Sequence, residues 1–253
     1  MIHRHSHEAG GIDPTALLRR QESECTEVYL ADLTGTLDRV DPTGDPADMI
    51  IVCLSGAADA RADGRSFHLH RMSALYVPQG QEVYVRAEAG EPGRLVRYLY
   101  RAPRDTAPAT GTVKQVLARS LDESRLFDFG ANSGRPLVDQ GETNGCEVVV
   151  VAWPAGNRGA MVAHKEKEQT FYVMEGTGSI TVGSETVSVA PGDVVFVPRN
   201  TPHTTEAGAE VLTYLCFNSY ILRGSFGSFE EMYQEVAPGR IERWKKGDTS
   251  VGR

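Results

Sequence analysis

The chain has 253 residues, 40% of them hydrophobic, and a formal net charge of −8. This length suffices for one large domain or two ordinary domains, each with its own buried core. The acidic balance excludes a general nucleic-acid-binding protein, because such a protein needs a basic surface to neutralise phosphates.

The first residues, MIHRHSHEAGG, lack the apolar core of a secretory signal, and no apolar run approaches the ~20 residues that a membrane helix requires. Four cysteines lie far apart without a CxxC pair, which is typical of buried free thiols in a reducing compartment. They are Cys25, Cys53, Cys146 and Cys216. We therefore expect a soluble cytoplasmic protein with no membrane partner.

The N-terminal residues are predicted to form an arm followed by a short helix. His3, His5 and His7 recur at every second residue, so an extended chain would place them on one side. Ordering a free arm costs roughly 1–2 kcal/mol per residue, so we interpret these histidines as part of a solvated tail. Pro14 is typical of the first turn of a helix and predicts a helix that extends to Arg20.

Short strands are predicted from Glu27 onward, and they recur as an internal repeat. MIIVCLSG ends in Gly56 and Pro78 follows 22 residues later, whereas VMEG ends in Gly176 and Pro198 follows 22 residues later. The two sets are offset by 120 residues. RYLYRA and TYLCFN also match if AEAGEPGR contains a four-residue hairpin insertion. Such a repeat predicts two copies of one β-domain.

The two copies are separated by RAPRDTAPATG, a stretch rich in Pro, Ala and Thr that predicts a linker. The capping pattern S-x-x-E occurs at Ser120 with Glu123 and again at Ser228 with Glu231. It predicts a short helix after each of these serines.

The stretch from Ala163 to His203 carries the most distinctive motifs. EQTFYVMEGTG places six residues between Gln169 and Gly176, and PGDVVFVPRNTPH ends in His203. These segments resemble the two motifs of the cupin superfamily of small β-barrels, with Asn200 in the place of a motif glycine. Asn tolerates a left-handed backbone better than most residues, so this exchange is physically mild.

The resemblance implies an all-β fold of two tandem cupin (jelly-roll) β-barrels, a bicupin, with a few short helices. Under the 120-residue offset Met49 falls on Gln169 and Val83 on His203. Neither side chain suits a borderline metal ion, so the N-terminal barrel is expected to be degenerate. His68 and His70 are interpreted as ordinary strand residues. The expected organisation is an N-terminal arm and short helix (1–22), a degenerate cupin barrel (23–103), a linker (104–127), a cupin barrel with the site (128–222), and a C-terminal helix and tail (223–253).

Catalytic cupins hold a divalent metal ion on two or three imidazoles and one carboxylate or amide. The resemblance leaves three alignments open, depending on the length of one hairpin. The ligand positions are Ala163, Lys165, Gln169 and His203 in the first alignment; Val162, His164, Gln169 and His203 in the second; and His164, Glu166, Gln169 and His203 in the third. The third provides a full ligand set, and Glu168 is close enough in sequence to replace Glu166 or Gln169.

Two functional hypotheses follow. In the first, the C-terminal barrel is a metal-dependent enzyme that uses Mn, Fe, Ni or Zn and acts on a small polar metabolite. The resemblance implies isomerase, aminohydrolase or dioxygenase chemistry, with Glu168 or Lys165 transferring protons. In the alternative, the barrel is a metal-free binding or structural module without catalysis. A homodimer is expected from the resemblance in either case.

Overall fold

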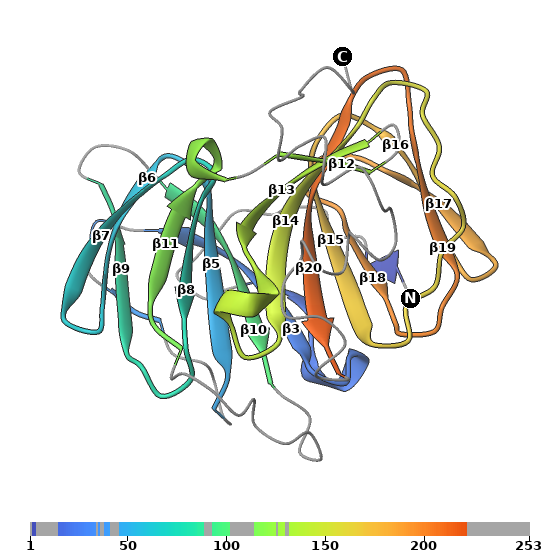
Figure 1. The fold of residues 1–253 in the computed structure, drawn as a ribbon. Coiled ribbons are helices and arrows are strands. Elements are labelled where there is room, and N and C mark those ends of the chain that lie inside the picture. The colour runs from blue at the N-terminus through green and yellow to red at the C-terminus, as the bar shows by residue number, and fades with distance from the viewer. Residues whose placement is uncertain are drawn as a thin grey trace. The chain divides into compact units, whose positions relative to one another are not determined.

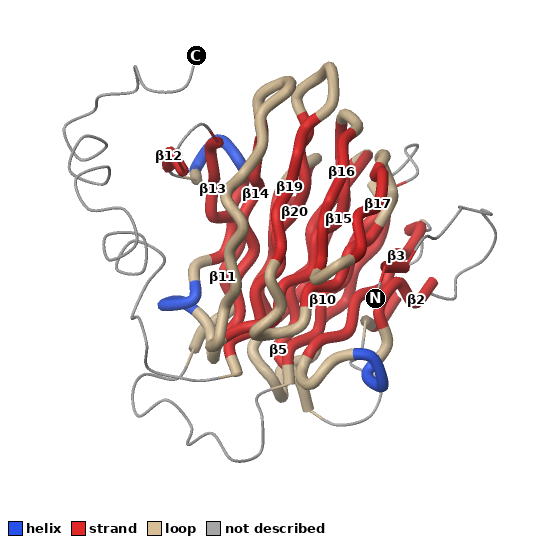
Figure 2. The backbone as a smooth tube through the Cα atoms, turned by 90° about the vertical axis from the view of Figure 1, so that its right-hand side faces the viewer, coloured by secondary structure: helices blue, strands red, loops and turns tan. Residues whose placement is uncertain are grey.

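The computed structural model describes residues 2–3, 15–33, 35, 38–40, 46–88, 93–101, 114–124, 126–129 and 132–221. It consists of β-strands and short 3-10 helices, which confirms the predicted all-β class (Figures 1 and 2). The chain divides into two compact units. The N-terminal unit comprises Glu8–Ser124 and Glu142–Gly145, and the C-terminal unit comprises Met1–His7, Arg125–Gly141 and Cys146–Arg253.

The N-terminal unit contains two antiparallel sheets. The six-stranded sheet has the order β11 (Leu117–Ser120), β8 (Ser73–Val77), β5 (Asp48–Ser55), β10 (Gly93–Tyr100), β3 (Thr26–Leu33) and β2 (Thr15–Leu18). The four-stranded sheet has the order β4 (Asp38–Arg39), β9 (Val83–Ala87), β6 (Ala57–Ala62) and β7 (Arg65–His70). One apolar cluster draws its side chains from both sheets.

The C-terminal unit repeats this arrangement. Its seven-stranded sheet has the order β1 (Ile2–His3), β18 (Val194–Val197), β15 (Lys167–Glu175), β20 (Leu212–Tyr220), β14 (Cys146–Trp153), β13 (Asn132–Val138) and β12 (Phe127–Phe129). Its three-stranded sheet has the order β17 (Glu185–Val189), β16 (Gly178–Val182) and β19 (His203–Ala207). A second apolar cluster again lies between the sheets.

The jelly-roll fold is confirmed, but the expectation of closed barrels is not. Across the described residues the two sheets of each unit remain separate, so each unit is an open sandwich. In the strands that supply the two core clusters, such as β5 and β15, alternate side chains face the shared core, because successive residues of a strand point to opposite faces.

The strand pairing supports most of the predicted repeat. Met49 pairs with Val77, and Gln169 pairs with Val197, in both cases between equivalent strands offset by 120 residues. The last strand of each unit differs from expectation: Leu99 pairs with Met49 and Asn218 pairs with Gln169, an offset of 119 residues. The predicted four-residue insertion is therefore wrong. Two residues of the last strands are equivalent when they pair with equivalent residues of the neighbouring strand. The similarity of the letters RYLYRA and TYLCFN does not follow this pairing.

The predicted helix near residues 14–20 is also wrong. Thr15–Leu18 forms strand β2, which pairs with β3, and a 3-10 helix, η1, follows at Arg20–Glu22. Leu17 and Leu18 are buried, so pairing and burial outweigh the local helix signal. His5, His7 and the helix predicted after Ser228 lie outside the described residues.

Within the predicted linker, the structure describes strand β11 and the 3-10 helix η2, Leu121–Glu123. Ser120 and Glu123 form the predicted capping box, in which the Ser120 N–H donates to the Glu123 carboxylate at 2.7 Å. All four cysteines are free and buried. The described residues include no helix with the length and hydrophobicity of a membrane span.

A short connection, Glu142–Gly145, belongs to the N-terminal unit although the residues on either side of it belong to the other unit. Asn144 donates two hydrogen bonds to the buried carboxylate of Asp48, from Nδ2 at 3.0 Å and from its backbone N–H at 3.3 Å. Gly145 has a φ of +130°, and a Cβ atom there would lie 2.6 Å from the Tyr100 hydroxyl oxygen. Only glycine fits this close approach.

Candidate functional site

The interior face of strand β15 positions the first predicted ligand. Phe171 and Val173 belong to the core cluster, so by alternation Lys167 and Gln169 face the interior as well. Both are buried, with 4% and 7% of their surface exposed. Glu168 is buried too, but it lies on the opposite face of the strand.

A row of polar side chains crosses three neighbouring strands at the level of Gln169. Glu147 on β14 pairs with Asn218 on β20, and Asn218 pairs with Gln169 on β15. Gln169 Nε2 donates to Asn218 Oδ1 at 2.9 Å, and Asn218 Nδ2 donates to Glu147 Oε1 at 2.7 Å. The Tyr220 hydroxyl donates to the same Glu147 oxygen at 3.0 Å.

Two oxygen atoms of this row have no hydrogen-bond partner among the described residues. They are Gln169 Oε1 and Glu147 Oε2, and both are buried. An unpaired buried acceptor costs free energy, so atoms of this kind often mark a place where a ligand or ion completes the site.

The two histidines of the predicted site lie next to each other. The rings of His164 and His203 have centroids 5.3 Å apart, and the His203 ring lies 6.1 Å from that of Phe171 in the core. His203 Nδ1 lies 3.0 Å from the Thr201 carbonyl oxygen. Because a carbonyl can only accept, Nδ1 carries the proton and Nε2 keeps a free lone pair.

Both imidazoles are neutral at physiological pH. Burial, together with the positive charge of Lys167 and with His203, lowers the pKa of His164 to about 3. Burial also lowers the pKa of His203, helped by Lys167 and opposed by the hydrogen bond to Thr201. Neutral imidazole is the form that binds a metal ion.

The backbone brings the segment before β15 next to the start of β19. Val162 and His203 form an antiparallel bridge, and His164, which belongs to both the second and the third alignment, lies two residues further along the chain. Glu166 approaches the site, with Oε1 at 3.6 Å from His164 Nδ1. Lys165, the other predicted proton-transfer residue besides Glu168, is exposed.

The second motif has the predicted turn. Asn200 adopts a left-handed backbone with a φ of 60°, and its N–H donates to the His164 carbonyl at 2.6 Å. Gly80, its counterpart in the N-terminal unit, has a φ of 84°. In the first motif Gly176 has a φ of +75°, and a Cβ there would lie 2.0 Å from the Val211 carbonyl oxygen. Glycine is therefore required at that turn.

Sequence reasoning missed Lys167, Glu147 and Asn218. The Lys167 ammonium lies 5.4 Å from the centroid of the Tyr220 ring. Burial raises the pKa of Glu147 to about 7, and the charge of Lys167 opposes this shift. The sequence pattern could have indicated that both charged residues lie on strands of the core. Glu147 begins the apolar run EVVVVAW, and Lys167 stands two residues before Gln169 and therefore on the same face of its strand.

The predicted site residues carry donor atoms of the kinds that bind divalent metal ions. Among the described residues no three His, Cys, Asp or Glu side chains are grouped closely enough to hold a metal ion alone. Gln169 adds an amide oxygen, which is buried without a hydrogen-bond partner among the described residues of the same unit. Two imidazoles with one amide and one nearby carboxylate are typical of borderline metals such as Mn, Fe, Ni and Zn.

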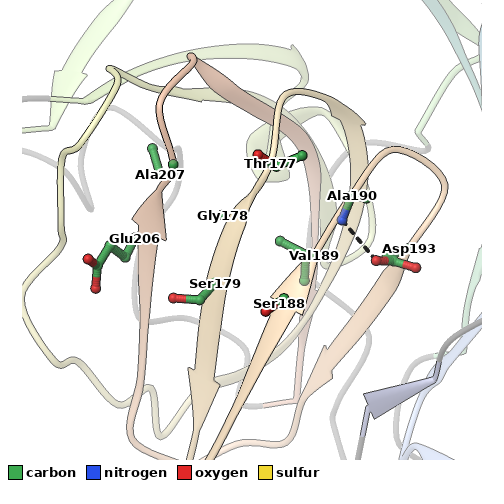
Figure 3. Close-up of a pocket in the computed structure, with 10 residues that line it drawn as sticks. Thr177, Gly178, Ser179, Ser188, Val189, Ala190, Asp193, Glu206 and Ala207 are labelled. Carbon is green, nitrogen blue, oxygen red and sulfur yellow. Dashed lines mark hydrogen bonds between the residues drawn. The ribbon is translucent and has the colours of Figure 1, made fainter.

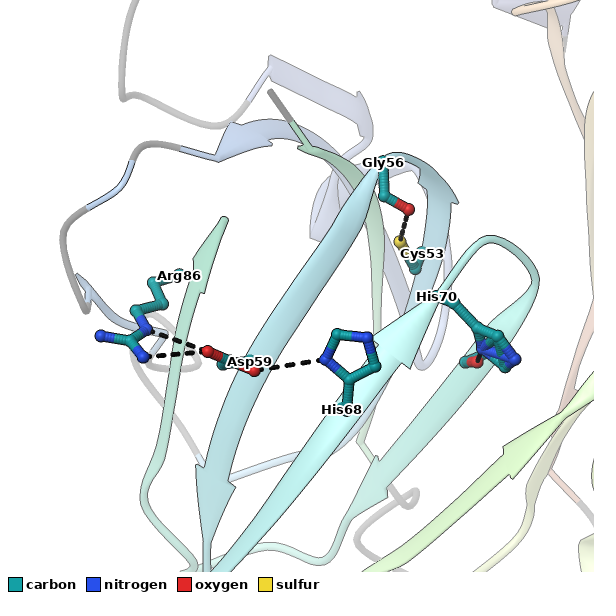
Figure 4. Close-up of polar contacts among 7 residues, drawn as sticks. Cys53, Gly56, Asp59, His68, His70 and Arg86 are labelled. Atoms are coloured by element: carbon teal, nitrogen blue, oxygen red, sulfur yellow. Dashed lines mark hydrogen bonds and ion pairs between the residues drawn. The ribbon is translucent and has the colours of Figure 1, made fainter. Parts of the chain in front are cut away.

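The histidine pair of the N-terminal unit has a different environment. His68 and His70 lie exposed on β7 (Figure 4). His68 Nδ1 contacts Asp59 at 3.3 Å, Asp59 also binds Arg86 at 2.9 Å, and His70 contacts the Ser73 hydroxyl at 2.6 Å. Hydrogen bonding to Arg86 and then to His68 lowers the pKa of Asp59. These contacts agree with ordinary strand residues.

A groove of about 600 Å³ opens on the C-terminal unit (Figure 3). The polar row of Glu147, Asn218 and Gln169 does not line it. Small residues of β16, β17 and β19 line it, and Asp193 accepts a hydrogen bond from the Ala190 N–H at 2.9 Å. None of the predicted site residues lines this groove.

Comparison with known proteins gives matches in the same region. The Cupin domain family model matches residues 148–218. An uncharacterized protein of Streptomyces coelicolor is 38% identical over 83 residues, which cover 33% of this chain and 76% of that protein. An uncharacterized protein of Methanocaldococcus jannaschii is 34% identical over 64 residues, and the match covers 25% of this chain and about half (51%) of that protein's length.

Solved structures extend the similarity to both units. The protein Ylba of E. coli has a TM-score of 0.71 at 16% identity, with 85% of each chain covered. A mutant of the Bacillus subtilis oxalate decarboxylase has a TM-score of 0.65 at 14% identity, with 94% of this chain and 79% of the other covered. The Cupin domain match and the relative that is 38% identical show that the chain belongs to the cupin superfamily, and the solved structures share its fold.

Proposed function

We propose that the C-terminal unit binds a divalent metal ion and acts as an enzyme on a small polar metabolite. The observation that carries this proposal is the meeting of two neutral imidazoles, His164 and His203, in a unit where Gln169 presents a buried, unpartnered carbonyl oxygen. Together these groups can supply two nitrogen ligands and one oxygen ligand.

His164, His203 and Gln169 would hold the ion, and Glu166 lies near enough to His164 to supply a carboxylate. A bound ion of this kind polarises a carbonyl or hydroxyl oxygen of the substrate. The neutral state of both histidines favours binding, because no proton has to be displaced from either ring near neutral pH.

Lys167 suggests the charge of the substrate. Its ammonium is close enough to both histidines to lower the pKa of each, and its side chain is buried in the interior of the unit. We assign to Lys167 the binding of an anionic group, such as a carboxylate, on the substrate. Lys165 and Glu168 stay predictions as proton-transfer residues; the first is exposed and the second faces away from Gln169.

The fold neighbours do not narrow the reaction further. One of them is an oxalate decarboxylase, but at 14% identity it supports the fold alone. The choice among isomerase, aminohydrolase and dioxygenase chemistry therefore belongs to the proposal. A homodimeric assembly and a cytoplasmic location also belong to the proposal. The four cysteines without disulfides support the location, because such thiols are typical of a reducing compartment.

Elemental analysis of protein purified without a histidine tag tests the proposal. We expect stoichiometric Mn, Fe, Ni or Zn in the natural protein and its loss in His203→Ala, because that change removes one of two imidazoles. His68→Ala is the matched control, since it removes an exposed histidine of the other unit and should leave the metal content unchanged.

A natural protein without metal under non-chelating conditions, or a His203→Ala variant that retains its metal, would contradict the proposal. The metal-free alternative then gains support if a small carboxylate such as malonate raises the Tm of the natural protein but not that of Lys167→Met. Such a result would identify an anion-binding module centred on Lys167.

A further inference from the structure

We propose that Glu147 and Asn218 are positioning residues, which fix the direction of the Gln169 side-chain amide so that its oxygen faces the metal site. This inference rests on the proposed function and deepens it. It concerns two residues that contact neither His164 nor His203 through any hydrogen bond in the described structure.

The argument begins with the chemistry of an amide. An Asn or Gln side chain donates only from its nitrogen and accepts only at its oxygen, and only the oxygen can bind a metal ion. Gln169 can therefore act as a ligand in one orientation of its amide and not in the other. Something must hold it in the productive orientation.

The hydrogen bonds of the polar row fix the orientation of the Gln169 side-chain amide. Glu147 Oε1 is an acceptor, so Asn218 must turn its Nδ2 toward it, at 2.7 Å. That places Asn218 Oδ1 on the other side, where it accepts from Gln169 Nε2 at 2.9 Å. With its nitrogen held in this bond, Gln169 leaves Oε1 without a partner among the described residues. The orientation of the Asn218 amide thus follows from Glu147, and the orientation of the Gln169 amide follows from Asn218.

Protonation of Glu147 need not disturb this direction. Glu147 Oε1 already accepts from both Asn218 Nδ2 and the Tyr220 hydroxyl, whereas Oε2 has no partner among the described residues. A proton bound by this carboxyl group therefore belongs on Oε2, and Oε1 stays an acceptor. Glutamine at this position can place its carbonyl oxygen in the same way and keep the direction without any charge.

Two variants of Glu147 separate the effect of its acceptor oxygen on the orientation of the Asn218 amide from the effect of its charge. Glu147→Gln and Glu147→Leu both remove the carboxylate, but only Glu147→Gln keeps an acceptor for Asn218. We expect Glu147→Gln to bind Mn²⁺ and Zn²⁺, titrated separately, within about threefold of the natural protein. Glu147→Leu is expected to bind each ion about tenfold or more weakly, the usual effect of losing a residue that orients a ligand. Tyr220→Phe, which removes only the second donor to Glu147, should resemble Glu147→Gln.

The same pair in a Gln169→Glu background provides the control for simple structural damage. A carboxylate has two equivalent oxygens and needs no orientation, so the ratio of the dissociation constants of the Glu147→Leu and Glu147→Gln forms should fall from about ten to about one. A ratio that stays near ten with Glu at position 169 would overturn the inference, because the loss would then not pass through the amide.

A readout without metal keeps this test separate from that of the proposed function. In metal-free natural protein and in Glu147→Gln, NMR of the Gln169 side-chain NH₂ should show one set of signals, because a single orientation is populated. In Glu147→Leu a second set should appear. One identical set in all three proteins would overturn the inference, whereas failure of the natural protein to bind Mn²⁺ or Zn²⁺ would overturn only the proposed metal site.

Discussion

The two units of this chain share one fold, and they carry different side chains at equivalent interior positions. Gln169 and Asn218 of the C-terminal unit correspond by strand pairing to Met49 and Leu99 of the N-terminal unit. His203, the first residue of β19, corresponds to Val83, the first residue of β9. The same sheet geometry thus holds two amides in one unit where the other unit has two apolar side chains.

A buried carboxylate is nevertheless common to both units. Glu27 on β3 corresponds to Glu147 on β14, but its environment differs. Both oxygens of Glu27 are used, one by the guanidinium of Arg101 and one by the hydroxyl of Tyr29. Glu147 Oε1 accepts from two neutral side-chain donors, whereas Oε2 has no partner of this kind among the described residues. A buried acid that is fully paired supports structure, whereas one with spare hydrogen-bonding capacity is available to a ligand. The prediction that the N-terminal unit is a silent copy remains to be tested.

The largest expected effect comes from breaking the paired carboxylate. Arg101→Met leaves Glu27 buried without its cation and should lower the free energy of unfolding by about 3–5 kcal/mol. Tyr220→Phe, at the corresponding position of the C-terminal unit, removes one neutral hydrogen bond and should cost about 1 kcal/mol. Urea denaturation measures both values. Equal costs would mean that the two carboxylates are held in equivalent ways.

The pH dependence of stability should reveal the second carboxylate. Burial raises the pKa of Glu147 from 4.5 to about 7, so the folded protein keeps a proton that the unfolded chain has released. Its contribution to the free energy of unfolding therefore falls as pH rises from about 4.5 to 7, by on the order of 3 kcal/mol. Glu147→Gln removes this decline.

His164 acts in the opposite sense, because its lowered pKa destabilises the fold as pH falls from about 6.5 toward about 3. The comparison that isolates Glu147 is thus the difference between Glu147→Gln and the natural protein, measured by urea denaturation with a chelator at pH 5 and pH 7.5. Glu147→Gln should gain relative stability at the higher pH. Parallel pH profiles would show that Glu147 titrates as an ordinary glutamate.

The smallest expected effect comes from giving the C-terminal unit the side chains of the other unit. Gln169→Met or Asn218→Leu alone leaves a buried polar partner unpaired and should cost about 1–3 kcal/mol. The double variant recreates the Met and Leu combination and leaves only Glu147 short of one donor, so it should cost less than the sum of the two single variants. Thermal or urea unfolding measures this recovery, and additive costs would contradict the equivalence of the two pairs of side chains.

The sequence predicted the features that depend on local chemistry. Alternation and turn residues gave the strands of each copy, and Asn200 was identified as a left-handed position that the structure confirms with a φ of 60°. These signals are local because a turn depends on the φ of a few residues and alternation depends on neighbouring residues.

Features set by distant pairing were not predictable in the same way. The position of His164 next to His203 depends on the bridge between Val162 and His203, which lie 41 residues apart in the sequence (203 − 162 = 41). Thr15–Leu18 becomes a strand because β3 is available to pair with it. The polar row was missed because Glu147, Asn218 and Gln169 meet only once three strands are placed in register.

The connection Glu142–Gly145 limits how far the two copies can still be exchanged as modules. Its Asn144 supplies two hydrogen-bond donors to Asp48, a carboxylate of the earlier copy with 3% of its surface exposed. A gene cut between the copies would take those donors away and leave Asp48 with the donors of Tyr76 and Gln79 among the described residues. The earlier copy thus depends for part of its buried hydrogen bonding on a residue that stands 96 positions later in the sequence than Asp48.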